Sequence, residues 1–331
     1  MPHSNISIFV PHVGCPHMCS FCNQRTITGT DKIPHGEDVQ KICEQAEKEI
    51  KNPQETEIAF FGGSFTAVPR EYMLELLQAA QPYIGKGKFK GIRLSTRPDY
   101  IDEEVLDILM KNGVSSIELG AQSLSDKVLE MNERGHSAYD VEKAAGLIRN
   151  YGFELGLQMM IGLYGSTQQD EYNTAEKIVE LAPDTVRIYP VVILEGTKLG
   201  ELYKSGEYKT FDFDTALDIT AKCMEMFAEN NIRVIKVGLH SSEFVEEQML
   251  GGFYHPALRE LCEGKIYLDK LKKIIDGNVK SVVISVPQRN LSKALGQKKC
   301  NIAYFEKMGV KLRIIPDSSQ TDELTVVNIE R

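Results

Sequence analysis

Short runs of apolar and β-branched residues alternate along the chain with longer segments whose apolar positions recur every three or four residues. The short runs predict β-strands and the longer segments predict amphipathic helices. Strands are expected at residues 6–10, 57–61, 91–96, 116–120, 153–161 and 185–192, and helices at residues 38–50, 70–83, 102–112, 139–151, 170–181 and 213–230. Six strand–helix repeats in series predict parallel strands joined by crossover helices, as either a barrel or an open doubly wound sheet.

The pattern changes after residue 231. Further strands are expected at residues 232–238, 281–286, 310–315 and 324–329, and further helices at residues 257–275 and 299–308. This order predicts a small α+β unit over residues 232–331 that packs on a barrel or sheet formed by residues 1–231. In either arrangement of parallel strands, a ligand site is expected at the carboxyl ends of the strands.

The composition is that of a globular protein, since 42% of the 331 residues are hydrophobic and 26% are charged. No apolar run approaches the roughly 20 residues that span a bilayer, and the N-terminus lacks the basic and apolar regions of a signal peptide. Seven cysteines in a chain of this length do not indicate a disulfide scaffold. We therefore expect a cytoplasmic protein with no membrane association.

Three of the cysteines, Cys15, Cys19 and Cys22, lie within eight residues directly after the first predicted strand. Thiolates this close together select zinc or an iron–sulfur cluster. Because structural zinc takes four ligands, three thiolates are better suited to a [4Fe–4S] cluster whose remaining iron is open to a small molecule. The alternative is a zinc site completed by one of three histidines near the N-terminus, His3, His12 or His17.

This cysteine spacing, with the aromatic Phe21 before the last cysteine, resembles the signature of the radical S-adenosylmethionine (SAM) superfamily. The ends of the next four predicted strands carry sequences similar to that family: FFGGSFT at residues 60–66, STRPD at 95–99, ELGAQS at 118–123 with NERGH at 132–136, and MMIGL at 159–163. Over about residues 5–260 the chain is similar to the radical SAM half of the Elongator catalytic subunit and, more distantly, to oxygen-independent coproporphyrinogen oxidases. The resemblance implies an α/β fold, an incomplete (β/α)6 barrel of the TIM type.

The resemblance also implies an enzyme that holds a [4Fe–4S] cluster on the three cysteines and reductively cleaves SAM to methionine and a 5′-deoxyadenosyl radical. The turn of Gly62, Gly63 and Ser64 would bind the amino group of SAM, with a hydroxyl at Ser64 where the family often has Glu. Arg134 would bind the SAM carboxylate, and its alternative role is a surface ion pair with Glu133 or a neighbouring residue. The other implied SAM contacts are Phe21, Ser95, Gln122, Gln158 and Val192. A low-potential electron donor of the flavodoxin or ferredoxin type is implied as a partner.

Tyr254 and His255 lie in a glycine-rich stretch, residues 251–256, that leads into the predicted C-terminal unit. A loop there could close over the barrel mouth and supply a proton or a hydrogen atom, so the two residues are candidates for catalysis. The alternative is a plain connector between two parts of the fold.

Charge is unevenly distributed along the chain. The whole chain has a net charge of −9, but residues 264–313 hold twelve lysines and arginines against three acidic residues, a local charge of +9. The remainder therefore carries −18. A local excess this large is typical of a phosphate-binding surface, although a solvated basic face is the alternative. The candidate nucleic-acid contacts are Arg289, Lys293, Lys298 and Lys299.

These features favour a radical SAM enzyme that modifies RNA, in particular tRNA, because the related Elongator subunit acts on the wobble uridine of tRNA. That subunit continues into an acetyltransferase domain, for which this chain leaves no room, so we expect no acetyl transfer. One alternative is a radical SAM enzyme that acts on a small metabolite or a tetrapyrrole. The other is a non-catalytic module that binds a cluster or zinc.

Overall fold

A computed structural model describes residues 4–10, 15, 18–23, 32–240, 243–276, 278–321 and 323–331. Its internal contacts divide the chain into two compact units. The first comprises residues 1–211 and 226–254, and the second comprises residues 212–225 and 255–331. Helix α9 (Phe213–Glu229) contributes to both.

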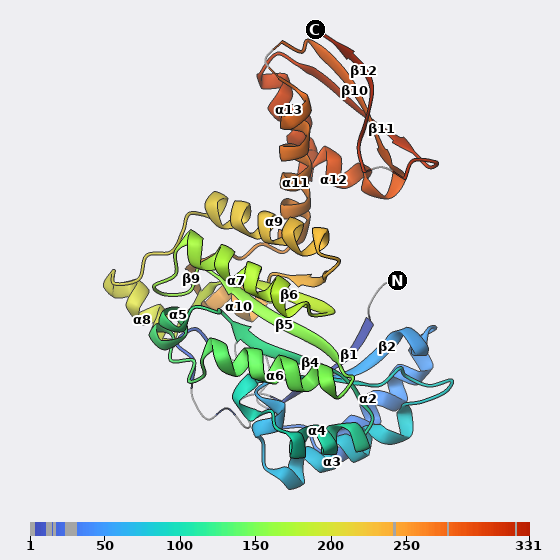
Figure 1. The fold of residues 1–331 in the computed structure, drawn as a ribbon, viewed down its shortest axis with the longest axis vertical. Helices are drawn as coiled ribbons and strands as arrows, with labels where there is room; N and C mark the ends of the chain where they lie inside the picture. The colour runs from blue at the N-terminus through green and yellow to red at the C-terminus, as the bar shows by residue number, and fades with distance from the viewer. Residues whose placement is uncertain are drawn as a thin grey trace. The chain divides into compact units, whose positions relative to one another are not determined.

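The first unit is built on a curled sheet of seven parallel strands, with helices packed against it (Figure 1). In spatial order the strands are β1 (Ser4–Val10), β2 (Thr56–Gly62), β3 (Ile92–Thr96), β4 (Val114–Gln122), β5 (Glu154–Ile161), β6 (Thr185–Pro190) and β8 (Arg233–Val237). The strands β1 and β8 form the two edges of this sheet. The barrel is therefore incomplete, which confirms the predicted fold class.

The predicted helices are all present in the described part of this unit, with ends shifted by a few residues. They are α2 (Gly36–Glu49), α3 (Arg70–Ala80), α4 (Glu103–Lys111), α6 (Ala138–Asn150), α7 (Gln168–Leu181) and α9. The structure adds elements that the periodicity did not indicate: α5 (Asp126–Met131), α8 (Lys198–Ser205), α10 (Glu243–Gln248), and a small antiparallel pair of β7 (Val192–Leu194) with β9 (Met249–Gly252). Among the residues described, no helix is both long enough and apolar enough to cross a membrane.

One predicted strand belongs to a different unit from the one expected. Residues 232–238 were assigned to the C-terminal unit, whereas β8 pairs in parallel with β6 and completes the large sheet. The helix α9 before β8 makes it one more crossover repeat of the barrel. No change of composition marks the end of these repeats, so the sequence placed the boundary at residue 231 while residues 226–254 group with the barrel.

Local signals account for where several helices begin and end. At α6 the Ser137 hydroxyl accepts a bond from the Asp140 N–H, and the Asp140 carboxylate accepts one from the Ser137 N–H, which is a capping box. Thr167 and Asp170 form the same arrangement at α7. After α4, Gly113 has φ +76, the left-handed conformation predicted for a glycine at a helix C-terminus.

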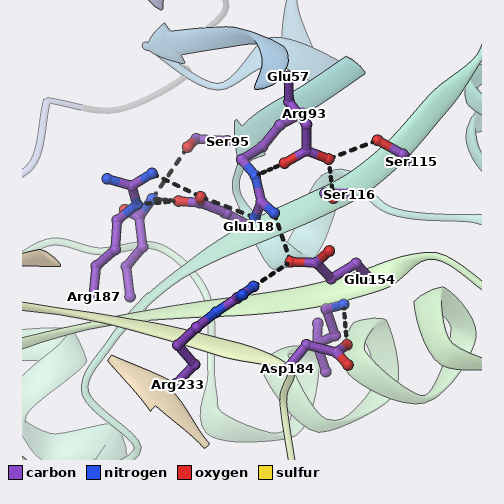
Figure 2. A network of polar contacts seen from close by, with 12 residues as sticks. Glu57, Arg93, Ser95, Ser115, Ser116, Glu118, Glu154, Asp184, Arg187 and Arg233 are labelled. Atoms are coloured by element: carbon purple, nitrogen blue, oxygen red, sulfur yellow. Dashed lines mark hydrogen bonds and ion pairs between the residues drawn. The ribbon is translucent and has the colours of Figure 1, made fainter. Parts of the chain in front are cut away.

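A network of buried charges crosses the inside of the sheet (Figure 2). Arg93 on β3 donates from Nε to Glu57 Oε2 at 2.7 Å, from Nη1 to Glu118 Oε1 at 3.2 Å and from Nη2 to Glu154 Oε1 at 2.6 Å. Neither Arg93 nor Glu57 is exposed to solvent. Although burial opposes ionisation, Arg93 and two serine hydroxyls lower the pKa of Glu57 to about 2. One guanidinium thus ties together three strands besides its own.

The second unit is a small α+β fold, as predicted for this part of the chain. Its three-stranded sheet has the order β11 (Lys311–Asp317), β10 (Ser281–Pro287) and β12 (Thr325–Glu330). The pairing is parallel between β10 and β11 and antiparallel between β10 and β12. Its helices are α11 (Leu258–Ile274), α12 (Leu291–Leu295) and α13 (Cys300–Lys307). Their apolar side chains, including Leu271 and Phe305, form one core with Val282 and Ile284 of the sheet.

Candidate active site

The three clustered cysteines follow β1 at its carboxyl end, in a loop that is described at Cys15 and at residues 18–23. All three are free thiols. Burial raises the pKa of the Cys15 thiol, although a hydrogen bond from the Ser64 backbone lowers it. The Cys22 N–H donates to the Cys19 carbonyl oxygen at 3.1 Å. The fold therefore places the thiols at the end of the barrel where parallel strands position ligand sites.

The chemistry of this donor set fits an iron–sulfur cluster, because thiolates bind such clusters and the remaining iron needs no protein ligand. The histidines of the alternative zinc site, His3, His12 and His17, lie outside the described residues. Across the ranges that the structure describes, no three His, Cys, Asp or Glu side chains are grouped closely enough to hold a metal ion, the three cysteines included. A [4Fe–4S] cluster takes each thiolate on a different iron, so it does not require the three sulfurs to surround a single ion.

Arg134, in the loop after α5, contacts the cysteine loop directly. Its Nη1 donates to Cys19 Sγ at 3.2 Å and its Nη2 donates to the Gly120 carbonyl oxygen at 2.7 Å. Its Nε is buried and has no hydrogen-bond partner in the described part of the chain. The ion pair that was the alternative role is absent among the described residues, because Glu133 instead pairs with Lys198 on α8. Arg134 thus brings a positive charge to one of the predicted cluster ligands.

The turn after β2 is shaped by a close approach to β1. Gly62 has φ +114, and a Cβ there would lie 3.0 Å from the Val10 carbonyl oxygen. The Gly63 N–H donates to that same oxygen at 2.8 Å. The Ser64 hydroxyl, expected to face SAM, lies 3.0 Å from Thr96 Oγ1 in a buried hydrogen bond. The backbone of the turn is therefore the part that can meet an ammonium group.

A cavity of about 880 Å³ inside the half-barrel draws its lining from all seven strands and from Cys22. Its volume is in the upper part of the range for small-molecule sites. Six predicted SAM contacts line it: Phe21, Gly62, Ser95, Gln122, Gln158 and Val192. Gln122 ends β4 with φ +66, and its Oε1 is buried without a partner among the described residues. Three other predicted contacts, Gly63, Ser64 and Arg134, are not part of the lining.

The polar wall of this cavity is continuous with the buried charge network (Figure 2). Gln158 Nε2 donates to Ser95 Oγ at 3.1 Å and to Glu118 Oε2 at 2.9 Å. Arg187 binds Glu118 with two bonds, of 2.6 and 2.9 Å, and lies over the Phe61 ring at 4.9 Å from its centre. Burial opposes ionisation of Glu118, but the Arg187 charge keeps its pKa below the usual range. Ser95 and Gln158 are thus held in fixed orientations.

Sequence reasoning missed several residues that line the cavity, among them Arg187, Tyr189, Lys236 and His240. Burial, Lys236 and Arg187 lower the pKa of His240, so its ring is neutral at neutral pH. A signal for two of them was present in the sequence. Arg187 and Lys236 interrupt apolar strands, and a charge in such a strand is tolerated where alternate side chains face a polar lumen.

The two candidates for catalysis, Tyr254 and His255, are not part of the cavity lining. The Tyr254 hydroxyl donates to Glu246 Oε1 at 3.0 Å, and its ring packs against Val245 and its apolar neighbours. His255 Nδ1 accepts a bond from the Ala257 N–H at 3.0 Å, so its ring holds the start of α11. Of the predicted SAM contacts, Val192 belongs to the apolar cluster against which Tyr254 packs.

The four candidate nucleic-acid contacts all lie in the second unit, but they differ in their partners. Lys293 is paired with Glu263 at 3.2 Å, which neutralises it. Arg289, Lys298 and Lys299 are exposed, and the described residues offer them no ion pair. The two lysines have φ +52 and +60 immediately before α13. The structure thus places Lys298 and Lys299 directly before α13.

A buried carboxyl group that the sequence did not reveal holds the loop after β5. Glu171 on α7 accepts bonds at Oε1 from the Gly162 N–H, at 2.8 Å, and from the Ser166 hydroxyl, at 2.5 Å. Burial raises its pKa from 4.5 to about 7. Because the unfolded state loses this proton near pH 4.5 while the folded state keeps it up to about pH 7, the stability of the fold falls as the pH rises from about 4.5 to about 7, and this group causes no further loss above that.

We expect Glu171→Gln to be more stable than the parent at pH 8, by up to about 3 kcal/mol, because the amide oxygen keeps both bonds without a buried charge. The difference should shrink steadily below pH 7 and be smallest near pH 5. Urea unfolding at pH 5, 7 and 8 measures it. Glu176→Gln, at an exposed position of the same helix, is the control and should show no pH-dependent difference. A gain for Glu171→Gln of equal size at pH 5 and pH 8 would contradict this account.

Two family models match the chain. The model of the radical SAM superfamily matches residues 9–178, just over half of the chain, and the model of the radical SAM C-terminal domain matches residues 183–267. The second match begins in the barrel and ends in α11. Together they cover the cysteine loop and all of the cavity lining except Asn5 and Ser7.

Several curated proteins are similar in sequence. The chain is 32% identical over 222 residues to an uncharacterized protein of Methanocaldococcus jannaschii, covering 66% of this chain and 65% of the relative. It is 31% identical over 196 residues to the tRNA uridine(34) acetyltransferase of Methanocaldococcus infernus, and 27% identical over 190 residues to Elongator complex protein 3 of Saccharomyces cerevisiae. These two matches cover 53% and 51% of this chain but only 37% and 34% of the relatives. The chain thus corresponds to part of each relative.

Two solved structures share the fold. The archaeal Elp3 of Methanocaldococcus infernus superposes with a TM-score of 0.64 at 23% identity, covering 82% of this chain and 64% of that one. The coproporphyrinogen III oxidase HemN of Escherichia coli, a radical SAM enzyme, superposes with a TM-score of 0.50 at 17% identity, covering 69% of this chain and 53% of that one. Both likenesses bear on the fold alone.

Proposed function

Because this chain belongs to the radical SAM superfamily and is therefore an enzyme that uses SAM and a [4Fe–4S] cluster, we propose a substrate for it, namely RNA and specifically tRNA. The sequence relatives whose printed names refer to tRNA uridine support this choice of substrate class. The observation that carries it is the distribution of charge in the second unit. The chemistry at the modified nucleoside would begin from the radical that SAM supplies.

Different residues of the chain would bind the cluster and SAM. We propose that Cys15, Cys19 and Cys22 hold the cluster, which when bound supplies the electron that cleaves SAM to methionine and a 5′-deoxyadenosyl radical. Arg134 would hold the SAM carboxylate by a charge-assisted bond, since its buried Nε lacks a partner among the described residues. The amide oxygen of Gln122 is likewise buried and has no partner among the described residues, so it could also bind SAM. The lumen of the half-barrel would shield a reactive radical from bulk water.

The cations of the second unit are unevenly neutralised. Of the twelve between residues 264 and 313, four pair with acidic side chains: Lys265, Lys270, Lys272 and Lys293. The other eight have no ion pair within the described ranges: Lys273, Lys280, Arg289, Lys298, Lys299, Lys307, Lys311 and Arg313. A fold that leaves so many cations unpaired presents a field suited to a polyanion such as RNA, whose phosphates supply the missing charge.

The direct test is anaerobic incubation of the reconstituted, reduced enzyme with SAM and total tRNA, followed by nucleoside mass spectrometry. We expect a tRNA nucleoside whose mass changes only when both SAM and enzyme are present. The double variant Lys298→Glu/Lys299→Glu should bind tRNA on the order of tenfold more weakly and lower the slope of log affinity against log salt by about 2. Measuring the tRNA affinity at a series of salt concentrations gives both the loss of affinity and the change in slope.

The matched control is Lys48→Glu/Lys51→Glu, which makes the same change in charge at two exposed lysines of the barrel unit. It should bind tRNA as the parent does. Equal losses in both double variants would mean that only net charge matters and would remove the second unit from the proposal. Cleavage of SAM that a small metabolite or tetrapyrrole stimulates, with no change in any tRNA nucleoside, would replace RNA by a small-molecule substrate.

A further inference from the structure

One buried side chain of the cysteine loop is tied to the body of the barrel. Ser20 lies between Cys19 and Cys22 and is 1% exposed, whereas Met18 in the same loop is 69% exposed. The Ser20 N–H donates to the carbonyl oxygen of Asn132 at 3.2 Å, and its hydroxyl donates to Asn132 Oδ1 at 2.9 Å. Two bonds to one residue fix both the main chain and the side chain of Ser20, so the position of the loop depends on Asn132.

Asn132 is itself held firmly. It is 0% exposed, and its Nδ2 donates to the Val128 carbonyl oxygen at 2.8 Å and to the Tyr164 carbonyl oxygen at 2.9 Å. Both amide hydrogens and the amide oxygen are therefore used. Val128 belongs to α5 and Tyr164 to the loop after β5, so one side chain joins three segments that are far apart in the sequence.

The main chain bends directly after Asn132, so that residues on both sides of the bend contact the cysteine loop. Glu133 has φ +53, a conformation that residues other than glycine rarely adopt and that persists only where the surroundings hold it. Across this bend, Asn132 binds Ser20 while Arg134 binds Cys19. The N-terminal turn of α8 closes the arrangement, because the Leu199 N–H donates to the Ser20 carbonyl oxygen at 2.7 Å. Helices α5 and α8 lie side by side in Figure 1.

We propose that Asn132 is a positioning residue for the cysteine loop. Acting through Ser20, it sets where Cys19 and Cys22 stand relative to the cavity, and hence the geometry in which the cluster meets SAM. Metal sites need such support, because outer-shell hydrogen bonds hold the ligands in position. The ligand positions in turn determine the affinity and the properties of the bound metal. The inference rests on superfamily membership and not on the choice of RNA as substrate, and its test contains no RNA.

The test is Ser20→Ala, which removes one hydroxyl and leaves both backbone bonds of residue 20 in place. After anaerobic reconstitution, we expect iron and sulfide per chain to equal the parent, because all three thiols remain. The electron paramagnetic resonance spectrum of the reduced cluster should respond less to added SAM, and the Kd for SAM from equilibrium dialysis should rise about tenfold. Ser20→Thr, which keeps the hydroxyl, should recover both the spectral response and the affinity.

Thr56→Ala separates positioning from general destabilisation. Thr56 is as buried as Ser20, and its hydroxyl donates a bond of 3.2 Å to the Asn52 carbonyl oxygen, at the amino end of β2 and outside the cavity lining. We expect it to lower the thermal unfolding midpoint of the apo-protein while leaving the spectrum and the SAM affinity unchanged. The proposal is overturned if Ser20→Ala matches the parent in spectrum and affinity, or if the two alanine variants change these readouts alike. Should Ser20→Ala fail to load iron, an equal failure of Ser20→Thr would also overturn it.

Discussion

Replacing Cys19 by alanine is expected to abolish SAM cleavage, with a loss of more than about 100-fold, because even the outer partners of a metal site are worth 10–100-fold. Cys19 is one of the three cysteines in the radical SAM signature, and its sulfur accepts the bond from Arg134. Its loss would leave two of the three proposed cluster ligands and would remove the contact between Arg134 and Sγ. The measurement is 5′-deoxyadenosine formed per chain after anaerobic reconstitution and reduction, together with iron content.

Cys300→Ala is the matched control for this experiment, because Cys300 is an exposed thiol on α13 that lies outside the signature. It should bind iron and cleave SAM at the parental rate. If Cys19→Ala cleaves SAM normally, the assignment of the cysteine loop to the cluster is wrong. If Cys300→Ala loses iron, the cluster draws on a thiol outside the loop and the proposed ligand set needs revision.

Replacing Arg93 by methionine is expected to lower the free energy of unfolding of the barrel unit by about 3–5 kcal/mol at pH 7. Arg93 is wholly buried and binds three carboxylates, those of Glu57, Glu118 and Glu154, which would lose their shared counter-charge (Figure 2). Methionine keeps the unbranched apolar stem of arginine without its charge, so we expect the unpaired carboxylates to account for most of the loss. Urea unfolding followed by circular dichroism provides the measurement.

The loss of stability caused by Arg93→Met depends on pH, and the ionisation of Glu57 sets the direction of this dependence. Its pKa in the folded protein is lowered to about 2 from 4.5, so its ionised form stabilises the fold above pH 4.5, and that contribution disappears as the pH falls toward 2. The deficit of Arg93→Met relative to the parent should therefore shrink between pH 7 and pH 3. A deficit that stays constant over this range would point to lost packing as its cause.

Lys90→Met is the control for burial within the same network. Lys90 Nζ lies 3.7 Å from Glu57 Oε1 and 3.2 Å from Glu154 Oε2, but its side chain is 45% exposed. Exposed pairs are worth about 0–1 kcal/mol, since solvent screens them. The account fails if removing this exposed lysine costs as much as removing the buried arginine.

Local patterns predicted the elements of this fold because strand and helix periodicities and capping residues act over a few residues. The expected strands at residues 57–61 and 116–120 became β2 and β4, and Gly113 ends α4 in the conformation predicted for it. The position of β8 escaped prediction because membership of a sheet is decided by pairing with β6, which sequence neighbours do not report.

The candidate site likewise has features that the sequence predicts and features that only the fold reveals. The spacing of Cys15, Cys19 and Cys22 is a local property, and so is the glycine turn that lets β2 approach β1, so both could be read from the sequence. Arg134 had two possible roles until the fold buried it against Cys19, 115 residues away along the chain. Parallel strands bring such distant residues to one end of a barrel, and no short-range pattern specifies which of them touch.

By itself the sequence determined the class of chemistry, since the three-cysteine signature and its accompanying motifs are continuous stretches of chain. It also determined that positive charge accumulates in residues 264–313, because net charge is a property of composition. Only the tertiary structure decided which side chains line the cavity, which cations are left without acidic partners among the described residues, and that Asn132 holds Ser20. Those properties depend on burial and on distances between residues far apart in the chain, and both are set by packing.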